Sequence, residues 1–168
     1  MRIISKINIS KIVKNHLATL VNDNSKKPDF GDWFTFLIIP MIFASLLVWF
    51  NILLTDRAHN IVITTLSILV GLLFNVIVII FDIIKRDNSQ KLKNELLTQL
   101  LTNISYTILI SLIIIGFTVL TFFNNVYIIL VSNWLVFFFL FHFFLTVLMV
   151  LKRVYILFLN EMEELEEE

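Results

Sequence analysis

The chain contains no cysteine, and only three glycines and two prolines occur among its 168 residues. The lack of cysteine excludes disulfides, thiolate metal sites and thiol catalysis. So few glycines build no phosphate-binding loop, and neither an HExxH nor a GxSxG motif occurs. Charge is balanced, with 13 Lys and Arg against 13 Asp and Glu, so net charge does not point to nucleic acid. We therefore expect no enzymatic activity, cofactor, metal ion or direct nucleic-acid site.

Hydrophobic side chains, in contrast, are in excess. They make up 58% of the chain, and the mean hydropathy is +0.91, whereas a soluble domain is roughly 45–50% apolar. The apolar stretches are continuous runs and lack the alternation of barrel strands. The predicted fold class is all-α, a polytopic membrane protein with four transmembrane helices and cytoplasmic helical extensions.

Four apolar segments are long enough to cross a hydrocarbon core about 30 Å thick, which takes roughly 20 helical residues. The last two come from one uncharged stretch, residues 96–151, which as a single helix would be about 84 Å long. The pair Asn124-Asn125 is its strongest polar break, so we predict a helical hairpin there. Pro40 is expected to bend the first helix. The predicted spans are 34–54, 61–84, 104–123 and 127–151, with a loop at 85–103.

Polar segments flank this transmembrane domain of residues 33–151. Residues 1–32 are basic and predict an amphipathic helix on the inner leaflet, with Val13 and Leu17 on its apolar side and Lys11, Lys14 and His16 on the other. The third helix is expected to begin as a cytoplasmic helix near residue 90, with Asn88 or Ser89 as the candidate cap. Residues 152–168 form an acidic tail into which the fourth helix is expected to continue.

The distribution of Lys and Arg predicts the orientation in the membrane. Of the 13 such residues, all but Arg57 fall on one side of the four predicted spans. Because Lys and Arg are enriched in cytoplasmic loops, both termini are expected in the cytoplasm, with the protein in the inner membrane of a bacterial cell.

Small and polar residues form a stripe along the second span, within about 80° of arc at 100° per residue. Such a stripe is not expected to face lipid. It either packs tightly against another helix or lines a pore, and Asp82 alternatively pairs with Lys85 or Arg86 at the interface. The residues of this stripe are Thr64, Ser67, Gly71, Asn75 and Asp82.

A second stripe follows the third span, with Gly116 on the far side of that helix. At most one stripe is expected to line a pore, and the second span is preferred because Asn75 lies near its middle and Asp82 is its only acid. The residues of the second stripe are Asn103, Thr107, Ser111, Thr118 and Thr121.

His142 lies near the middle of the fourth span, among several phenylalanines. Ionisable side chains at this depth are costly and often functional. A neutral histidine bonded to a neighbouring helix is the structural interpretation. In the functional one, His142 and Phe139 belong to a hydrophobic constriction that gates by dewetting.

The basic N-terminal segment, four spans, the charged loop KRDNSQKLKNE and the hairpin at Asn124-Asn125 together resemble the small four-helix membrane proteins of bacterial anti-phage defence, of the Rex, Hailong and Kiwa kind. The resemblance is one of architecture, and no functional residue is carried over. It implies a homo-oligomer that depolarises the membrane when infection is signalled, or one that senses the envelope for a cytoplasmic partner.

Two hypotheses follow from the sequence. In the first, the protein is a homo-oligomeric pore in the lipid bilayer, with a tetramer as the working assumption, held closed by its cytoplasmic helices. In the second, it is a non-conducting anchor or sensor that holds a cytoplasmic protein.

Overall fold

The computed structural model describes residues 8–20, 30–86, 91–123 and 125–166, and these ranges are helical without any strand. Three helices are long and apolar enough to cross a membrane, namely α4 (Asp56–Arg86), α5 (Lys91–Leu120) and α6 (Val126–Glu166). Helix α4 contains the predicted span 61–84, and α6 contains the predicted span 127–151. Helix α5 contains the predicted span 104–123 as far as Leu120. The first predicted span is a shorter apolar helix, Phe34–Trp49.

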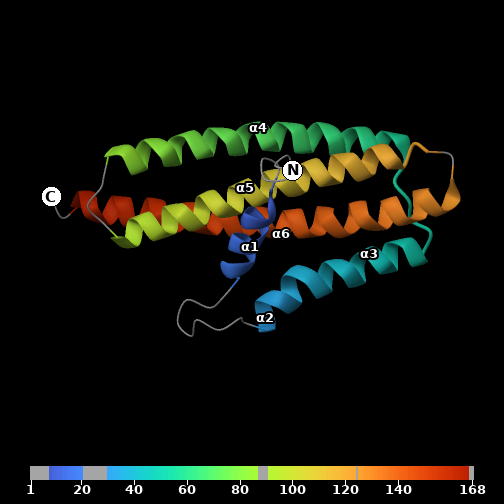
Figure 1. Ribbon diagram of the computed structural model, residues 1–168, viewed down its shortest axis with the longest axis horizontal. Coiled ribbons are helices and arrows are strands. Elements are labelled where there is room, and N and C mark those ends of the chain that lie inside the picture. The colour runs from blue at the N-terminus through green and yellow to red at the C-terminus, as the bar shows by residue number, and fades with distance from the viewer. Residues whose placement is uncertain (1–7, 21–29, 87–90, 124, 167–168) are drawn as a thin grey trace, which may run out of the picture.

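The long helices lie side by side in the order α4, α5, α6, α3 (Figure 1). The last of these, α3 (Ile39–Trp49), continues from α2 (Phe30–Trp33) through a π-helical segment, η2 (Phe34–Ile38). In the described residues α3 and α4 do not contact each other, so α3 packs on α6 and α4 packs on α5. The arrangement is therefore an open row of helices, and its two outer members each leave one side uncovered.

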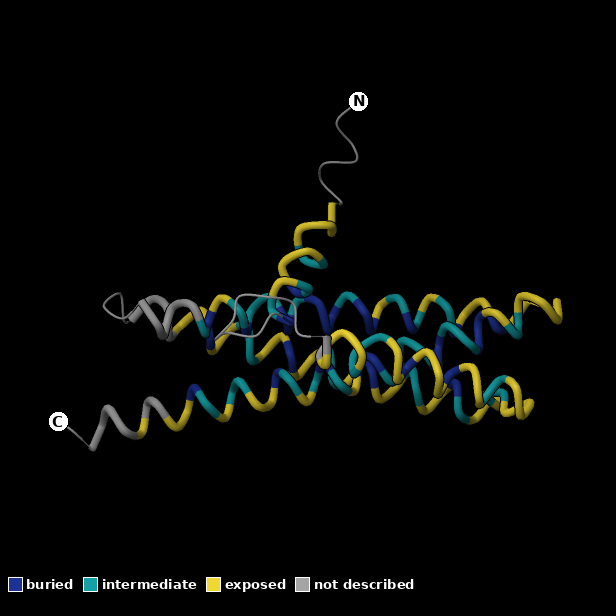
Figure 2. Tube along the Cα trace, turned by 90° about the horizontal axis from the view of Figure 1, so that it is seen from below, coloured by how far each residue is buried: buried dark blue, intermediate teal, exposed yellow. Residues whose placement is uncertain are grey.

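Two apolar clusters join α4, α5 and α6. One joins Leu73 and Ile80 of α4 to residues of α5 and α6, and the other joins Leu66 of α4 to Tyr106 of α5 and Phe143 of α6. The three α4 residues are seven apart, a spacing that keeps them on one side of a helix. That side, in blue and teal in Figure 2, is the one that α4 presents to α5.

The π-helical segment ends two residues before Pro40, the residue predicted to bend the first helix. Proline has no N–H, so the carbonyl of Phe36, four residues earlier, loses its ordinary helical donor. The break is thus local, and the helix resumes as α3 beyond it.

The first apolar helix ends five residues earlier than predicted, at Trp49 instead of residue 54. Asn51 adopts a left-handed φ of 59°, and the amides of Asn51 and Ile52 bond back to the carbonyls of Val48 and Leu47 at 3.0 and 2.9 Å. This is a Schellman ending, which asparagine tolerates better than most residues. The predicted end at residue 54 followed from the length of the apolar run alone and took no account of Asn51 as a helix terminator.

The predicted hairpin between α5 and α6 is confirmed. The Oδ1 atom of Asn125 accepts from the backbone amides of Tyr127 and Ile128 at 3.0 and 3.3 Å, so Asn125 caps α6. Helix α5 begins at Lys91, beside the predicted start near residue 90, and α6 continues to Glu166. The proposed caps Asn88 and Ser89 lie outside the described residues.

One further helix, α1 (Ser10–Ala18), crosses the row near its middle (Figure 1). It packs on α5 and leads away from one side of the row (Figure 2). Lys11 and Lys14 are exposed as predicted, whereas His16, predicted beside them, is fully buried. The prediction for His16 was wrong because α1 uses this side of the helix to contact α5.

Candidate functional site

The stripe on α4 faces away from the rest of the chain. All five of its residues are exposed, and their mean direction is about 170° from that of Leu66, Leu73 and Ile80 at 100° per residue. A Cβ atom built at Gly71 meets no atom within 4 Å. Within the part of the chain that the structure describes, the stripe is therefore uncovered and open to a second molecule. The exposed residues are Thr64, Ser67, Gly71, Asn75 and Asp82.

The stripe on α5 has the opposite fate, since all five residues are buried inside the row. Its hydroxyl groups donate to carbonyls of the same helix, as Thr107 does to Asn103 at 2.7 Å and Thr118 to Ile114 at 2.8 Å. Gly116 is exposed on the other side, as predicted. This stripe is a packing surface, which leaves α4 as the helix with an uncovered polar face.

His142 connects three helices. Its Nδ1 atom lies 2.8 Å from the carbonyl oxygen of Phe36, and its Nε2 atom lies 2.9 Å from the hydroxyl of Tyr106. A carbonyl only accepts, so Nδ1 carries the proton, and Nε2 of the neutral ring accepts from the tyrosine. His142 thus donates to the carbonyl that Pro40 leaves without its helical partner. Phe139, its proposed companion, stacks on Phe117 of α5.

His16 of α1 extends this cluster. Its ring stacks on Tyr106 with centroids 3.6 Å apart and an interplanar angle of 9°. Its Nδ1 atom lies 2.9 Å from Oδ1 of Asn103, a residue of the α5 stripe. Burial lowers the pKa of His16 from 6.5 to about 4. The ring is therefore neutral at physiological pH.

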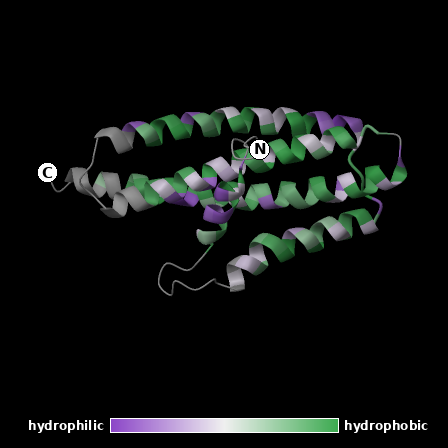
Figure 3. Ribbon diagram, in the orientation of Figure 1, coloured by the Kyte–Doolittle hydropathy of each residue, from purple (hydrophilic) through white to green (hydrophobic). Residues whose placement is uncertain are grey.

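The C-terminal end of α1 is held by a second set of polar contacts. The hydroxyl of Thr19 lies 2.7 Å from the carbonyl of His16 and 2.9 Å from Oδ1 of Asn103. Arg153 of α6 donates to the carbonyl of Thr19 at 3.2 Å. Figure 3 shows the resulting hydrophilic patch where α1 crosses the largely hydrophobic row. We call His16, Asn103, Tyr106, His142 and Arg153 the crossing cluster.

Sequence reasoning found only part of the crossing cluster. It singled out His142 and Asn103 but did not connect them, and it used Arg153 only for topology. Tyr106 was missed, although it is the one tyrosine within the third predicted span. A usable signal was histidine itself, because each of the three histidines of the chain is buried and bonds to a residue of another segment, His59 through the hydroxyl of Thr121 at 3.0 Å.

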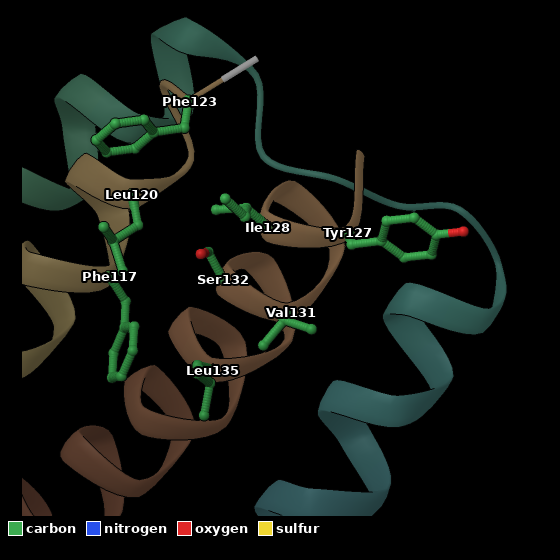
Figure 4. A pocket seen from close by; sticks show the side chains of 8 residues that line it. All are labelled: Phe117, Leu120, Phe123, Tyr127, Ile128, Val131, Ser132 and Leu135. Carbon is green, nitrogen blue, oxygen red and sulfur yellow. The ribbon is translucent and has the colours of Figure 1, made fainter. Parts of the chain in front are cut away.

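An apolar groove of about 490 Å³ lies between α5 and α6 near the Asn125 end of the row (Figure 4). Ser132 supplies a hydroxyl group, the ring of Tyr127 points away from the other lining side chains, and none of the lining residues is charged (Figure 4). The lining of the groove is therefore almost entirely apolar. Across the described ranges, no three His, Asp or Glu side chains gather in a way that would hold a metal ion.

Comparisons of this chain with protein-family models, with curated proteins and with solved structures gave no match. The α4 stripe and the crossing cluster therefore provide the structural observations that bear on function.

Proposed function

We propose that this chain is a homo-oligomeric membrane protein that forms a gated pore with the α4 stripe toward its lumen. The observation that carries the proposal is the direction of the stripe, away from every helix of its own chain. A side chain such as Asn75 is costly to hold against lipid tails. Contact with a second copy, or with water enclosed by a ring of copies, removes that cost.

The dimensions support four membrane crossings. From Phe30 to Trp49 the first helix has about 30 Å of length at 1.5 Å per residue, which matches the hydrocarbon core. Along α5, from Asn103 in the crossing cluster to Thr121 just past the end of the helix, the axial distance is about 27 Å, which is close to the thickness of the hydrocarbon core. Exposed aromatic residues gather at the Asn125 end, as at a membrane interface. They are Trp49, Phe50, Phe122 and Tyr127.

The proposed orientation places both termini and the crossing cluster toward the cytoplasm of a bacterial cell. Twelve of the 13 Lys and Arg residues then lie on the cytoplasmic side, and Arg57 is the one on the other side. Reporter fusions at Asn88 and after Glu161 are expected to report the cytoplasm, and a fusion at Asn125 the far side. A far-side signal at Asn88 would exclude this orientation.

Four residues of the stripe have a role in the proposed pore. Asn75 and Ser67 hold water along the path, and Gly71 lets neighbouring copies approach closely. Asp82 lies at the inner mouth, where its carboxylate concentrates cations by its local field. Since α4 is an outer helix of an open row, a ring of copies brings one α4 from each to the centre.

The biological setting that we propose is anti-phage defence, in which opening of the pore collapses the membrane potential of an infected cell. The architecture supports this setting, because it resembles that of the small membrane proteins of such systems. It combines a basic amphipathic start, an apolar helical hairpin and a charged connecting segment.

Flux from liposomes that contain the purified protein tests the pore. Asn75→Leu removes the water-holding amide and is expected to lower the ion flux, while Asp82→Asn is expected to reduce cation preference more than assembly. Leu72→Ala is the matched control, since Leu72 is exposed on α4 about 90° from the stripe. Equal flux in parent, Asn75→Leu and Leu72→Ala proteins of the same oligomer size would exclude the α4 lumen.

A second candidate function is a non-conducting anchor or sensor for a cytoplasmic protein. It is favoured by α6, which continues as a helix from Arg153 to Glu166, about 20 Å past the crossing cluster, and ends in an acidic run. Capture of a specific soluble partner by the full-length protein, together with absence of flux under every condition, would select this function over the pore.

A further inference from the structure

The crossing cluster joins α1 to α5, to α6 and to the segment that leads into α3. His16 stacks on Tyr106, Tyr106 bonds to His142, and His142 bonds to the carbonyl of Phe36 in the π-helical segment that leads into α3. Nearby, Ile12 and Val13 of α1 pack against the apolar cluster that contains residues of α4, α5 and α6. One short helix therefore touches the contacts that position all four long helices.

The surface of α5 on which α1 docks through His16, which we call the seat of α1, also has features that favour release of the helix. Asn103 Oδ1 accepts from His16 Nδ1, so His16 Nε2 keeps an unprotonated lone pair, and this atom is buried without a partner among the described residues. The Nδ2 atom of Asn103, which is a donor, is likewise buried without a partner among the described residues. Buried polar atoms without partners oppose docking because water would satisfy them.

Helix α1 also depends on its seat for its structure. It has nine residues, and helices this short are marginal in water without tertiary contacts. Its exposed side carries Lys11 and Lys14, which suit water and lipid headgroups. A released α1 is therefore tolerated at the membrane surface, and docking and helix formation in this segment are coupled.

We propose that α1 is a reversible strap, seated on α5 through His16, that keeps the row of helices in its closed arrangement. Release of the strap exposes the Tyr106–His142 pair and frees the shared core of α4, α5 and α6 to rearrange. The role of α1 in gating rests on the pore proposed above, whereas the docking of α1 through His16 does not depend on that pore.

The absence of native cysteine allows a direct test with two engineered ones. Lys11 and Thr102 line the same cavity of about 290 Å³ between α1 and α5, so Lys11→Cys with Thr102→Cys reports docking through the rate of cross-linking by a short cleavable reagent. His16→Phe keeps the ring stacked on Tyr106 and removes the bond to Asn103. Lys14→Ala is the matched control on the exposed side of α1.

The expected result has two parts. His16→Phe slows cross-linking about fivefold, the effect of one lost hydrogen bond, and Lys14→Ala leaves the rate unchanged. In liposomes, His16→Phe raises ion flux, cross-linking in the same background suppresses that flux, and cleavage of the linker restores it. Circular dichroism of each full-length variant confirms that the long helices are intact.

The outcomes separate the strap from the pore. Cross-linking at the parental rate in both His16→Phe and His16→Ala proteins would overturn docking through His16. Flux that persists after complete cross-linking would show that α1 is no gate, although the pore stands. Absence of flux from all variants, with the cross-linking difference retained, would exclude the pore and the gating role while confirming the seat.

Discussion

The imidazole of His142 donates from Nδ1 to the carbonyl oxygen of Phe36 across 2.8 Å, and Phe36 is four residues before Pro40. A proline within an apolar helix removes the N–H that this carbonyl would otherwise receive. In lipid a backbone group without a partner is costly. The pair therefore explains both why a histidine is tolerated deep in α6 and why a proline is tolerated in the first apolar helix.

A double-mutant cycle tests this relationship. His142→Phe removes the donor and is expected to lower the free energy of unfolding by about 2 kcal/mol, because the Phe36 carbonyl is left unpaired. Pro40→Ala restores a helical N–H to that carbonyl. Thermal unfolding in detergent should then show a coupling of about 1 kcal/mol, with the double variant less destabilised than the sum of the single variants. Strict additivity would contradict the proposed compensation.

Acidification is expected to release α1. The pKa of His16 is lowered by burial from 6.5 to about 4, so between these pH values the released helix binds a proton that the docked helix does not. The docked state therefore has its full stability above about pH 6.5 and loses about 3 kcal/mol as the pH falls toward 4. Tyr106 of α5, and His142 and Arg153 of α6, face the ring, and Arg153 adds positive charge.

Hydrogen exchange of the α1 amides between pH 7.5 and 4.5, corrected for the intrinsic rate, measures this release. His16→Phe is the control, because it removes the titrating ring and should abolish the pH dependence. Identical pH profiles for parent and variant would show that His16 does not control docking.

Self-association through α4 is expected to depend on Gly71. A Cβ built at Gly71 or at Gly116 meets no atom of the chain within 4 Å, so leucine fits at either position in a single copy. Gly71→Leu should nevertheless weaken the oligomer, since close approach of two helices at the stripe needs a small residue. Gly116→Leu, on a helix face away from both stripes, should leave it intact. Sedimentation or native mass measurement in detergent distinguishes these outcomes, and equal effects of the two substitutions would contradict a specific α4 contact.

The end of α3 gives a prediction about stability. Asn51 holds a left-handed φ of 59°, a region that a β-branched residue enters at a cost of about 1–2 kcal/mol. Asn51→Val is expected to lower the free energy of unfolding by that amount, and Asn51→Gly to leave it unchanged or slightly raised. If thermal unfolding of the two variants coincides, the Schellman ending is not what terminates the helix.

Hydropathy and polar breaks were sufficient to predict the long helices. The uncharged runs predicted the bodies of α4, α5 and α6, and Asn125 marked the start of α6 because an asparagine beside a helix start caps its free amides. Asn51 was overlooked, since an apolar run long enough for a membrane hides a terminator that acts through backbone geometry.

Contacts between helices were harder to predict. Helical periodicity grouped Thr64 with Asn75 on one stripe and Thr107 with Thr118 on another, but the two stripes look alike in sequence. Which stripe is buried depends on how the row packs, and that information lies in pairings such as Tyr106 with His142, 36 residues apart. For the same reason His16 was assigned to the polar side of α1.

The measurement that tests the central claim most directly is the water accessibility of single cysteines along α4 in the membrane. The chain has no native cysteine, so Ser67→Cys, Asn75→Cys and Leu72→Cys each carry one reporter for a membrane-impermeant thiol reagent. If α4 lines the pore, positions 67 and 75 are modified when the pore is open, and position 72, which then faces lipid, is not. Modification of position 72 alone, or of none of the three in a conducting protein, would contradict a pore lined by α4.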